Sequence, residues 1–424
     1  MTSTSRLSGL RDLPVADRRR RIQDSTGVGP EALAALDPAH GLQVEQADHL
    51  IENVIGVMGI PVGLATNFTI NGRDVLIPMA TEEASVVAAA SNAARIARVL
   101  GGFHTSSTEP LMQAQIQVLD VVDPEGGRAR LLESRQEIID LANEQDPILV
   151  RFGGGVRDLL VRLVPSPVQT YVVAHLVVDV RDAMGANAVN TMAEAVATRV
   201  GEIAGGRPLL RILTNKADRR ITRARAVFDA ESLGGPQVVD DLVHAGALAQ
   251  ADPYRAATHN KGIMNGISAV VLATGNDTRA VEAGAHSHAI GPDGRYTSLS
   301  RFEKDADGNL VGFLELPMPV GLVGGATKAH PVARSALAIL GVGTAQELAD
   351  VVVATGLAQN LAAMRALATE GIQRGHMSLH ARNIAVTAGA TGDEVPQVVA
   401  RLISDKAIRA EHAQQVLAEL RSAR

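Results

Sequence analysis

The chain has 424 residues, of which 46% are hydrophobic and 20% charged, a composition typical of a folded globular protein. Forty basic and 46 acidic residues leave a formal charge of -6, and only 2% of residues are aromatic, so neither nucleic acid nor anionic lipid is an expected partner. The absence of cysteine excludes disulfides, thiolate metal sites and a nucleophilic thiol, and it fits a cytoplasmic protein.

The length exceeds what one hydrophobic core usually supports, so two or more packed units are expected. The N-terminal segment, MTSTSRLSGLRDLPVADRRRR, has no apolar stretch of the kind found in signal peptides. No uncharged apolar run approaches the ~20 residues that span a bilayer. We expect neither a targeting sequence nor a membrane anchor.

The elements predicted in chain order begin with an Ala-rich helix over residues 84–100, for which Thr81 is the expected N-cap. Runs rich in Val, Ile and Leu then predict strands at 116–122, 171–180 and 208–213. Further helices are predicted at 128–143, 190–204, 263–272 and 345–370. Helices alternate with strands in this order, which indicates an α/β or α+β class.

Two boundaries predict an inserted domain. Pro110, after TSSTE, and the polar stretch 215–220 bracket the three predicted strands and two of the helices. We therefore expect a large domain in two parts, 1–108 and 217–372, a small domain over 109–216 and a helical C-terminal segment over 373–424.

Several charged residues suit catalysis, although each also has an ordinary structural explanation. Glu82 and Glu83 would complement the positive end of the Ala-rich helix, and burial would be needed to keep one of them protonated. Lys261 is expected at a helix start, where an ammonium opposes the dipole and could polarise a carbonyl oxygen. Asp277 follows sixteen residues later, ~24 Å along a straight helix, so pairing with Lys261 requires a chain reversal or a second subunit.

The histidines leave two interpretations open. His376 and His380 share a helix face, but Met377 stands where the zinc-protease pattern requires Glu. A weaker metal alternative involves four further histidines: His259, His286, His288 and His330. An imidazole also suits proton donation to a leaving group near neutral pH.

Glycine-rich turns at 153–155, 182–187 and 323–327 could bring backbone amides close to phosphates. No G-x-G-x-x-G motif follows a predicted strand, so spacing gives no support for a Rossmann site. Arg11 and the run 18–21 could meet an anion, although most of that run suits a solvated helix face. These residues alone indicate an α/β enzyme of unassigned reaction.

Six blocks resemble the ordered signature of the class II hydroxymethylglutaryl-CoA (HMG-CoA) reductases. They are ENVIGVMGIPVGLATNFTINGRDVLIPMATEEASVVAAAS (52–91), DAMGANAVNTMAE (182–194), THNKGIMNG (258–266), ATGND (273–277), LVGGAT (322–327) and GHMSLHARN (375–383). The blocks extend over nearly the whole chain, and their shared order makes chance agreement improbable.

The resemblance implies a role for each matching residue. Glu83 would be the catalytic carboxyl, Lys261 the cation that polarises the carbonyl, Asp277 its acidic partner and His376 the acid that protonates departing coenzyme A thiolate. The positions matching hydroxymethylglutaryl contacts are Ser85, Arg255, Asn265 and Gln359, and Arg11 matches a contact to coenzyme A phosphate. No residue is assigned to a metal.

The nicotinamide nucleotide is expected on the small domain. The matching positions are Asp146, Asp182, Met184, Gly185, Asn187, Asn190 and Asn215. In the family, a carboxylate at the position of Asp146 binds the adenosine ribose hydroxyls, and it would repel a 2'-phosphate. NAD(H) is therefore expected, with NADP the less favoured cofactor.

The fold implied by the resemblance is α+β (mixed α/β). A large substrate-binding domain carries an inserted small non-Rossmann nucleotide-binding domain and a C-terminal flap, in a homodimer or a higher assembly of dimers. The implied reaction interconverts HMG-CoA with mevalonate and coenzyme A. Three alternatives stay open: the same reaction with NADPH in a biosynthetic role, a histidine-based metal-dependent hydrolase or lyase, and a non-catalytic dimeric binder.

Overall fold

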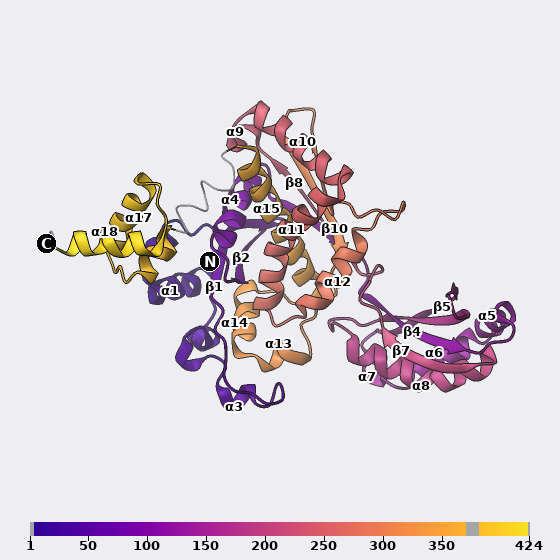
Figure 1. The fold of residues 1–424 in the computed structure, drawn as a ribbon. Coiled ribbons are helices and arrows are strands. Elements are labelled where there is room, and N and C mark those ends of the chain that lie inside the picture. The colour runs from indigo at the N-terminus through magenta and orange to yellow at the C-terminus, as the bar shows by residue number, and fades with distance from the viewer. Residues whose placement is uncertain (1–3, 370–380, 423–424) are drawn as a thin grey trace.

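The computed structural model describes residues 4–369 and 381–422, which form two β-sheets with their helices and a helical C-terminal unit (Figure 1). The larger sheet has six strands in the order β2-β1-β3-β8-β10-β9. Its strands are β1 (Val62–Ile70), β2 (Arg73–Ala80), β3 (Phe103–Ser107), β8 (Ile221–Phe228), β9 (Ser300–Lys304) and β10 (Leu310–Pro317). The main helices around it are α4 (Val86–Arg98), α10 (Pro236–Ala251), α11 (Pro253–Ala273), α12 (Thr278–His288), α14 (Pro331–Leu340) and α15 (Ala345–Ala368).

Short elements complete this part of the chain. Near the N-terminus they are η1 (Leu10–Asp12), α1 (Val15–Thr26), α2 (Pro30–Leu33), η2 (Ala34–Leu36), η3 (Pro38–His40) and α3 (Val44–Ala47). Further along the chain are α9 (Ala230–Leu233) and α13 (Gly325–Ala329). After the gap in the description, residues 381–387 are helical, and α17 (Glu394–Ser404) and α18 (Ala410–Ser422) follow; these helices share a core of their own.

Helix α15 lies at the centre of the larger unit, where it packs on α11, α4 and the sheet strand β8. Nearly every side chain from Ala345 to Leu361 is buried, because neighbours surround the helix on all sides. In the described part of the chain it is the one helix long and apolar enough to cross a membrane. Its burial in the hydrophobic core accounts for that apolarity.

The smaller sheet is antiparallel throughout, in the order β5-β6-β4-β7. Its strands are β4 (Leu111–Leu119), β5 (Gly155–Pro165), β6 (Thr170–Asp179) and β7 (Arg207–Leu213). The accompanying helices are α5 (Pro124–Glu133), α6 (Arg135–Asn143), α7 (Pro147–Arg151) and α8 (Ala186–Ala204). All of these elements fall within the predicted small domain, 109–216, and they enclose a separate hydrophobic core. The mixed α/β class is confirmed, whereas the exact domain boundaries stay a prediction.

Several details of the predicted helices are wrong. Thr81 is not the N-cap of the Ala-rich helix: α4 begins at Val86 after Ser85, and Glu82 and Glu83 lie in the preceding turn rather than in the helix. The single helix predicted over 128–143 is divided at Ser134 into α5 and α6.

Lys261 does not lie at a helix start either. Helix α11 already begins at Pro253, because the carboxylate of Asp252 accepts a hydrogen bond from the backbone N–H of Arg255 and caps the helix.

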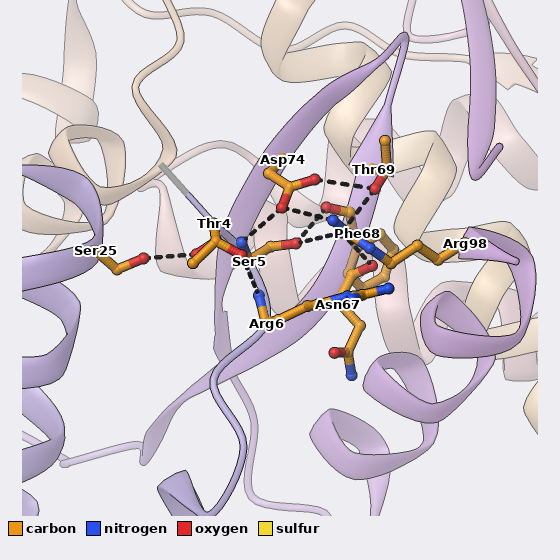
Figure 2. Close-up of polar contacts among 9 residues, drawn as sticks. All are labelled: Thr4, Ser5, Arg6, Ser25, Asn67, Phe68, Thr69, Asp74 and Arg98. Atoms are coloured by element: carbon orange, nitrogen blue, oxygen red, sulfur yellow. Dashed lines mark hydrogen bonds and ion pairs between the residues drawn. The ribbon is translucent and has the colours of Figure 1, made fainter. Parts of the chain in front are cut away.

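A polar network attaches the N-terminal segment to the β1–β2 hairpin and to the C-terminal end of α4 (Figure 2). The guanidinium of Arg98 donates to Asp74 Oδ2 at 2.8 Å and to the hydroxyls of Ser5 and Thr69 at 3.0 and 2.8 Å. Asp74 also accepts from the backbone N–H of Ser5 at 2.9 Å and from the Thr69 hydroxyl at 3.1 Å. The Ser5 hydroxyl in turn donates to the carbonyl of Phe68 at 2.7 Å. The network around this ion pair therefore joins four separate segments of the chain: the N-terminal segment, β1, β2 and α4.

The protonation of Asp74 makes this network dependent on pH. Burial opposes ionisation of the carboxyl, but the hydrogen bonds from Arg98, Ser5 and Thr69 outweigh it and lower the pKa to about 2. A lowered pKa contributes stability that is present above the unfolded-state pKa, about 4, and is lost as the pH falls towards 2.

We predict that Asp74→Asn lowers the free energy of unfolding by about 2 kcal/mol at pH 7 and that its deficit relative to the wild type shrinks below pH 4. Urea titrations of both proteins from pH 7 to pH 2.5 measure this difference. The control is Asp17→Asn, which removes an exposed pair with Arg20 and should change stability by less than about 0.5 kcal/mol. A deficit of Asp74→Asn that stays constant down to pH 2.5 would contradict the assignment.

Candidate functional site

Three of the predicted site residues meet where the turn before α4 approaches α11. Lys261 Nζ lies 3.2 Å from Glu83 Oε2, and the side-chain amide of Asn265 donates to the same oxygen at 3.4 Å. Lys261 and Asn265 are four residues apart, so both project from one face of α11. A carboxylate, an ammonium and an amide therefore converge on one point although Glu83 is 178 residues from Lys261 in sequence.

This ion pair remains open to solvent. The side chain of Lys261 is 63% exposed and that of Glu83 is 38% exposed. An exposed ion pair of this kind stabilises a fold very little. Fold stability is therefore a poor explanation for the close approach of these two charges. A ligand oxygen can instead approach the ammonium directly, and this arrangement can stabilise negative charge that develops on such an oxygen.

The remaining residues predicted to bind substrate come from the start of α4, from α11, from α15 and from η1. Ser85, two residues after Glu83, has a left-handed backbone (φ 79°) at the start of α4, and its side chain makes no capping bond. Arg255 lies in the first turn of α11. Gln359 comes from α15 and packs against α11 so closely that a Cβ placed on Gly266 would lie 2.8 Å from Gln359 Cβ.

The amide oxygen of Gln359 is buried and has no hydrogen-bond partner within the described residues. A buried acceptor left without a partner is costly, and a ligand hydroxyl would satisfy it. Arg11 is exposed in η1, and the structure shows no contact between it and the cluster in the described chain.

Asp277 occupies a different place from Lys261. Its carboxylate caps α12, accepting from the backbone N–H groups of Arg279 and Ala280 at 2.9 and 3.1 Å. Helix α11 continues for twelve residues beyond Lys261, ~18 Å, before the chain turns towards Asp277. Within the described residues of the single chain the two do not meet, so their pairing stays a prediction.

A pocket of about 750 Å³ opens beside Asp277, between the start of α8 and two loops of the larger unit. The larger unit contributes residues 275–277 and Arg279, together with residues around 321–327. The smaller unit contributes Gln145, Asp146, residues 183–188 and Thr191. Both units therefore supply walls of the same pocket.

Four of the seven residues predicted to bind nucleotide line this pocket: Asp146, Met184, Gly185 and Asn187. The other three do not. Asp182 Oδ1 accepts from the backbone N–H of Ala345 at the start of α15, and Asn190 Oδ1 accepts from that of Leu213, both at 2.8 Å. Asn215 is exposed after β7.

Several polar residues of the pocket wall were not predicted from the sequence, among them Asn276 and Arg279. Both lie within two residues of Asp277. Their position in or just after the ATGND block was the sequence feature that could have identified them.

The predicted acid His376, with its neighbour His380, lies outside the described residues. Of the four further histidines in the metal alternative, His286 and His259 form hydrogen bonds with neighbouring side chains. His286 contacts the hydroxyl of Tyr296 and the carboxylate of Glu282 at 2.7 and 3.1 Å. His259 contacts the hydroxyl of Ser300, and burial, with a smaller effect from Arg255, lowers its pKa to about 4. Within residues 4–369 and 381–422, no three His, Asp or Glu side chains are grouped as metal ligands would be.

Comparisons with known proteins agree with this geometry. The family model described as hydroxymethylglutaryl-coenzyme A reductase matches residues 14–381. The chain is 54% identical over 419 residues to the 3-hydroxy-3-methylglutaryl-coenzyme A reductase of Archaeoglobus fulgidus, covering 99% of this chain and 95% of that protein.

Solved structures give the same result. The chain superposes on the Streptococcus pneumoniae reductase with a TM-score of 0.83 and 40% identity, covering 97% of this chain and 99% of that one. A structure of the class II enzyme of that organism bound to NADPH in open conformations gives 0.82 and 40%, covering 96% and 100%. The resemblance in the sequence blocks is confirmed, and the chain belongs to the hydroxymethylglutaryl-CoA reductase family of oxidoreductases.

Proposed function

We propose that the chain interconverts HMG-CoA with mevalonate and coenzyme A through two hydride transfers, with NAD(H) as the preferred cofactor. The observation that carries this proposal is the convergence of Lys261, Glu83 and Asn265 at one solvent-accessible point. Reduction of a thioester places negative charge on one carbonyl oxygen in each of two steps, which is the charge that an exposed ammonium can stabilise.

In the reductive direction, a bound reduced nicotinamide nucleotide supplies the hydride in both steps. Lys261 stabilises the oxyanion when the thioester becomes a hemithioacetal, and again when the released aldehyde becomes an alcohol. Glu83, 3.2 Å from Lys261, delivers the proton to that oxygen. In the intermediate step the hemithioacetal oxygen returns its proton to Glu83 and re-forms the carbonyl as the carbon–sulfur bond breaks, and His376 protonates the departing thiolate.

The pocket beside Asp277 suits a dinucleotide in size and in polar groups. Its volume of about 750 Å³ lies within the range of small-molecule sites, and it presents the first turn of α8 and the carboxyl of Asp146. Asp146 uses Oδ1 to cap α7, at 2.9 Å from the backbone N–H of Leu149, which fixes the orientation of the carboxyl. A carboxylate held in this way favours ribose hydroxyls over a 2'-phosphate.

The second candidate is the same reaction with NADPH. A related class II enzyme from Streptococcus pneumoniae has been solved bound to NADPH, so family membership is compatible with either nucleotide. The assembly is proposed to be a cytoplasmic homodimer, or a larger assembly of dimers, in which Asp277 of one subunit reaches the Lys261 cluster of the other.

We predict that Lys261→Met and Glu83→Gln each lower kcat by at least about a hundredfold while the unfolding midpoint stays near that of the wild type, because the pair is exposed. Nicotinamide absorbance with mevalonate, coenzyme A and NAD measures turnover, and thermal unfolding measures stability. Lys304→Met, which removes a similarly exposed pair with Asp240, is the matched control and should leave turnover unchanged. Normal turnover in Lys261→Met would exclude the mechanism.

Cofactor choice is tested at Asp146. The wild type should have a higher kcat/KM with NADH than with NADPH, and Asp146→Ser should raise the NADPH to NADH ratio by about tenfold or more because repulsion of the 2'-phosphate is removed. Rates with both nucleotides for the two proteins provide the measurement. A wild-type preference for NADPH would refute the assignment of Asp146 and favour the second candidate.

Sharing of the site between subunits is tested by coexpressing Lys261→Met with Asp277→Asn. If the two residues meet across a dimer, each mixed dimer contains one intact site and one doubly altered site, so random assembly restores about a quarter of wild-type activity. Each variant expressed alone serves as the inactive reference. If the mixture is no more active than either reference, the shared site is wrong.

A further inference from the structure

Two buried polar residues immediately precede Lys261 in α11. His259 and Asn260 are only 2% and 0% exposed, although Lys261 itself projects into solvent. The other buried residues of α11 are apolar or glycine. Asn is a poor helix former, and a buried amide needs hydrogen-bond partners for its polar atoms. An apolar side chain would pack more favourably at this position, so packing alone is a poor explanation for the amide.

The Asn260 side chain forms three hydrogen bonds to the loop 296–299, which leads into β9. Its Nδ2 donates to the hydroxyl of Tyr296 at 3.0 Å and to the carbonyl of Thr297 at 2.9 Å. Its Oδ1 accepts from the backbone N–H of Leu299 at 3.0 Å. Two of the three partners are backbone groups, so the amide binds the main chain of the loop and is held in a single orientation.

His259 extends this connection to β9 and α15. Its Nε2 lies 2.7 Å from Ser300 Oγ, and the Ser300 hydroxyl donates to Asn360 Oδ1, also at 2.7 Å. A hydroxyl has one hydrogen, so the Ser300 oxygen accepts from His259, whose neutral ring therefore carries its proton on Nε2. Hydrogen bonds thus run without interruption from α11 through the first residue of β9 to α15.

The loop that receives these bonds is itself fixed from two further helices. The Thr297 hydroxyl donates to the backbone carbonyl of Gln250 in α10 at 2.8 Å. The Tyr296 hydroxyl lies 2.7 Å from His286 Nδ1 in α12. Residues 296–300 therefore contact four helices through polar groups. Helix α11 cannot turn about its axis without breaking several of these hydrogen bonds.

The rotation of α11 decides where the Lys261 side chain points. Successive residues of an α-helix project about 100° apart, so fixing His259 and Asn260 on the buried side also fixes the direction of Lys261 on the exposed side. Glu83 approaches from the turn before α4, and its exposed ion pair with Lys261 is too weak to hold a helix in place. The buried hydrogen bonds can supply that restraint.

We propose that Asn260, supported by His259, is a positioning residue that holds α11 at the rotation directing the Lys261 ammonium towards the reacting carbonyl oxygen. It acts through Lys261 from the buried side of the helix. The inference rests on the proposed function, because it takes Lys261 as the group that stabilises the oxyanion. A misplacement of about 1 Å in such a group can cost about a hundredfold in rate, so the chemical step should be the sensitive one.

The test is a double-mutant cycle in the full-length protein. For Asn260→Ala we expect kcat for HMG-CoA reduction to fall by about tenfold or more, while both KM values change by less than about twofold. In the Lys261→Met background the same substitution should lower kcat by less than about twofold, because no ammonium is left to direct. A substitution that only reduced the folded fraction would lower kcat by the same factor in both backgrounds.

Two further variants separate positioning from general damage. Val270→Ala removes buried apolar atoms from the same helix, so the unfolding midpoint should fall, but kcat should stay within about twofold of the wild type. Tyr296→Phe removes one of the three bonds to Asn260 at a partly exposed residue. Its kcat should fall about threefold, and only when Lys261 is present. This variant carries the cycle if Asn260→Ala does not fold.

Three results would overturn the inference. They are a kcat of Asn260→Ala, or of Tyr296→Phe in its place, equal to that of the wild type; an equal loss in both backgrounds; and a loss in Val270→Ala as large as in Asn260→Ala. If the wild type does not reduce HMG-CoA, or if Lys261→Met keeps normal turnover, the proposed function fails instead.

Discussion

The contact between α11 and α15 is the constraint on which the candidate catalytic cluster depends. The two helices approach so closely at Gly266 that an added Cβ would also lie 3.0 Å from the carbonyl of Thr355. Helix α4 also packs on α15, and the turn that carries Glu83 leads directly into α4. The separation of Lys261 from Glu83 is therefore set by helix packing in a rigid core, because the ion pair itself is too exposed to enforce it.

Sequence patterns predicted two strongly apolar elements closely. The predicted helix 345–370 and the strand 171–180 match α15 and β6 to within two residues at each end, because nearly every side chain in them is buried. Strand β5, GVRDLLVRLVP, was not predicted, since Arg and Asp interrupt its apolar run on the more exposed face. Helix starts were less predictable: Ser85 begins α4 from a left-handed conformation that propensity does not favour.

The site residues required different information. Composition and periodicity gave no reason to connect Glu83 with Lys261, which are 178 residues apart; the resemblance of the motif blocks connected them, and the structure places them 3.2 Å apart. Arg220 illustrates the opposite case. In sequence, an arginine between Arg219 and Ile221 is typical of an ordinary turn. Only the tertiary structure shows that the guanidinium of Arg220 donates to the backbone carbonyls of Ala183, Met184 and Val320, which are distant in sequence.

The construction of the pocket from both units has a consequence for folding cooperativity. The two sheets have separate hydrophobic cores, so each unit can in principle melt by itself. A ligand that touches residues 183–188 on one wall and 275–279 on the other bridges them, and its binding free energy is lost when either unit unfolds. Occupancy of the pocket would then merge two separable unfolding transitions into a single one.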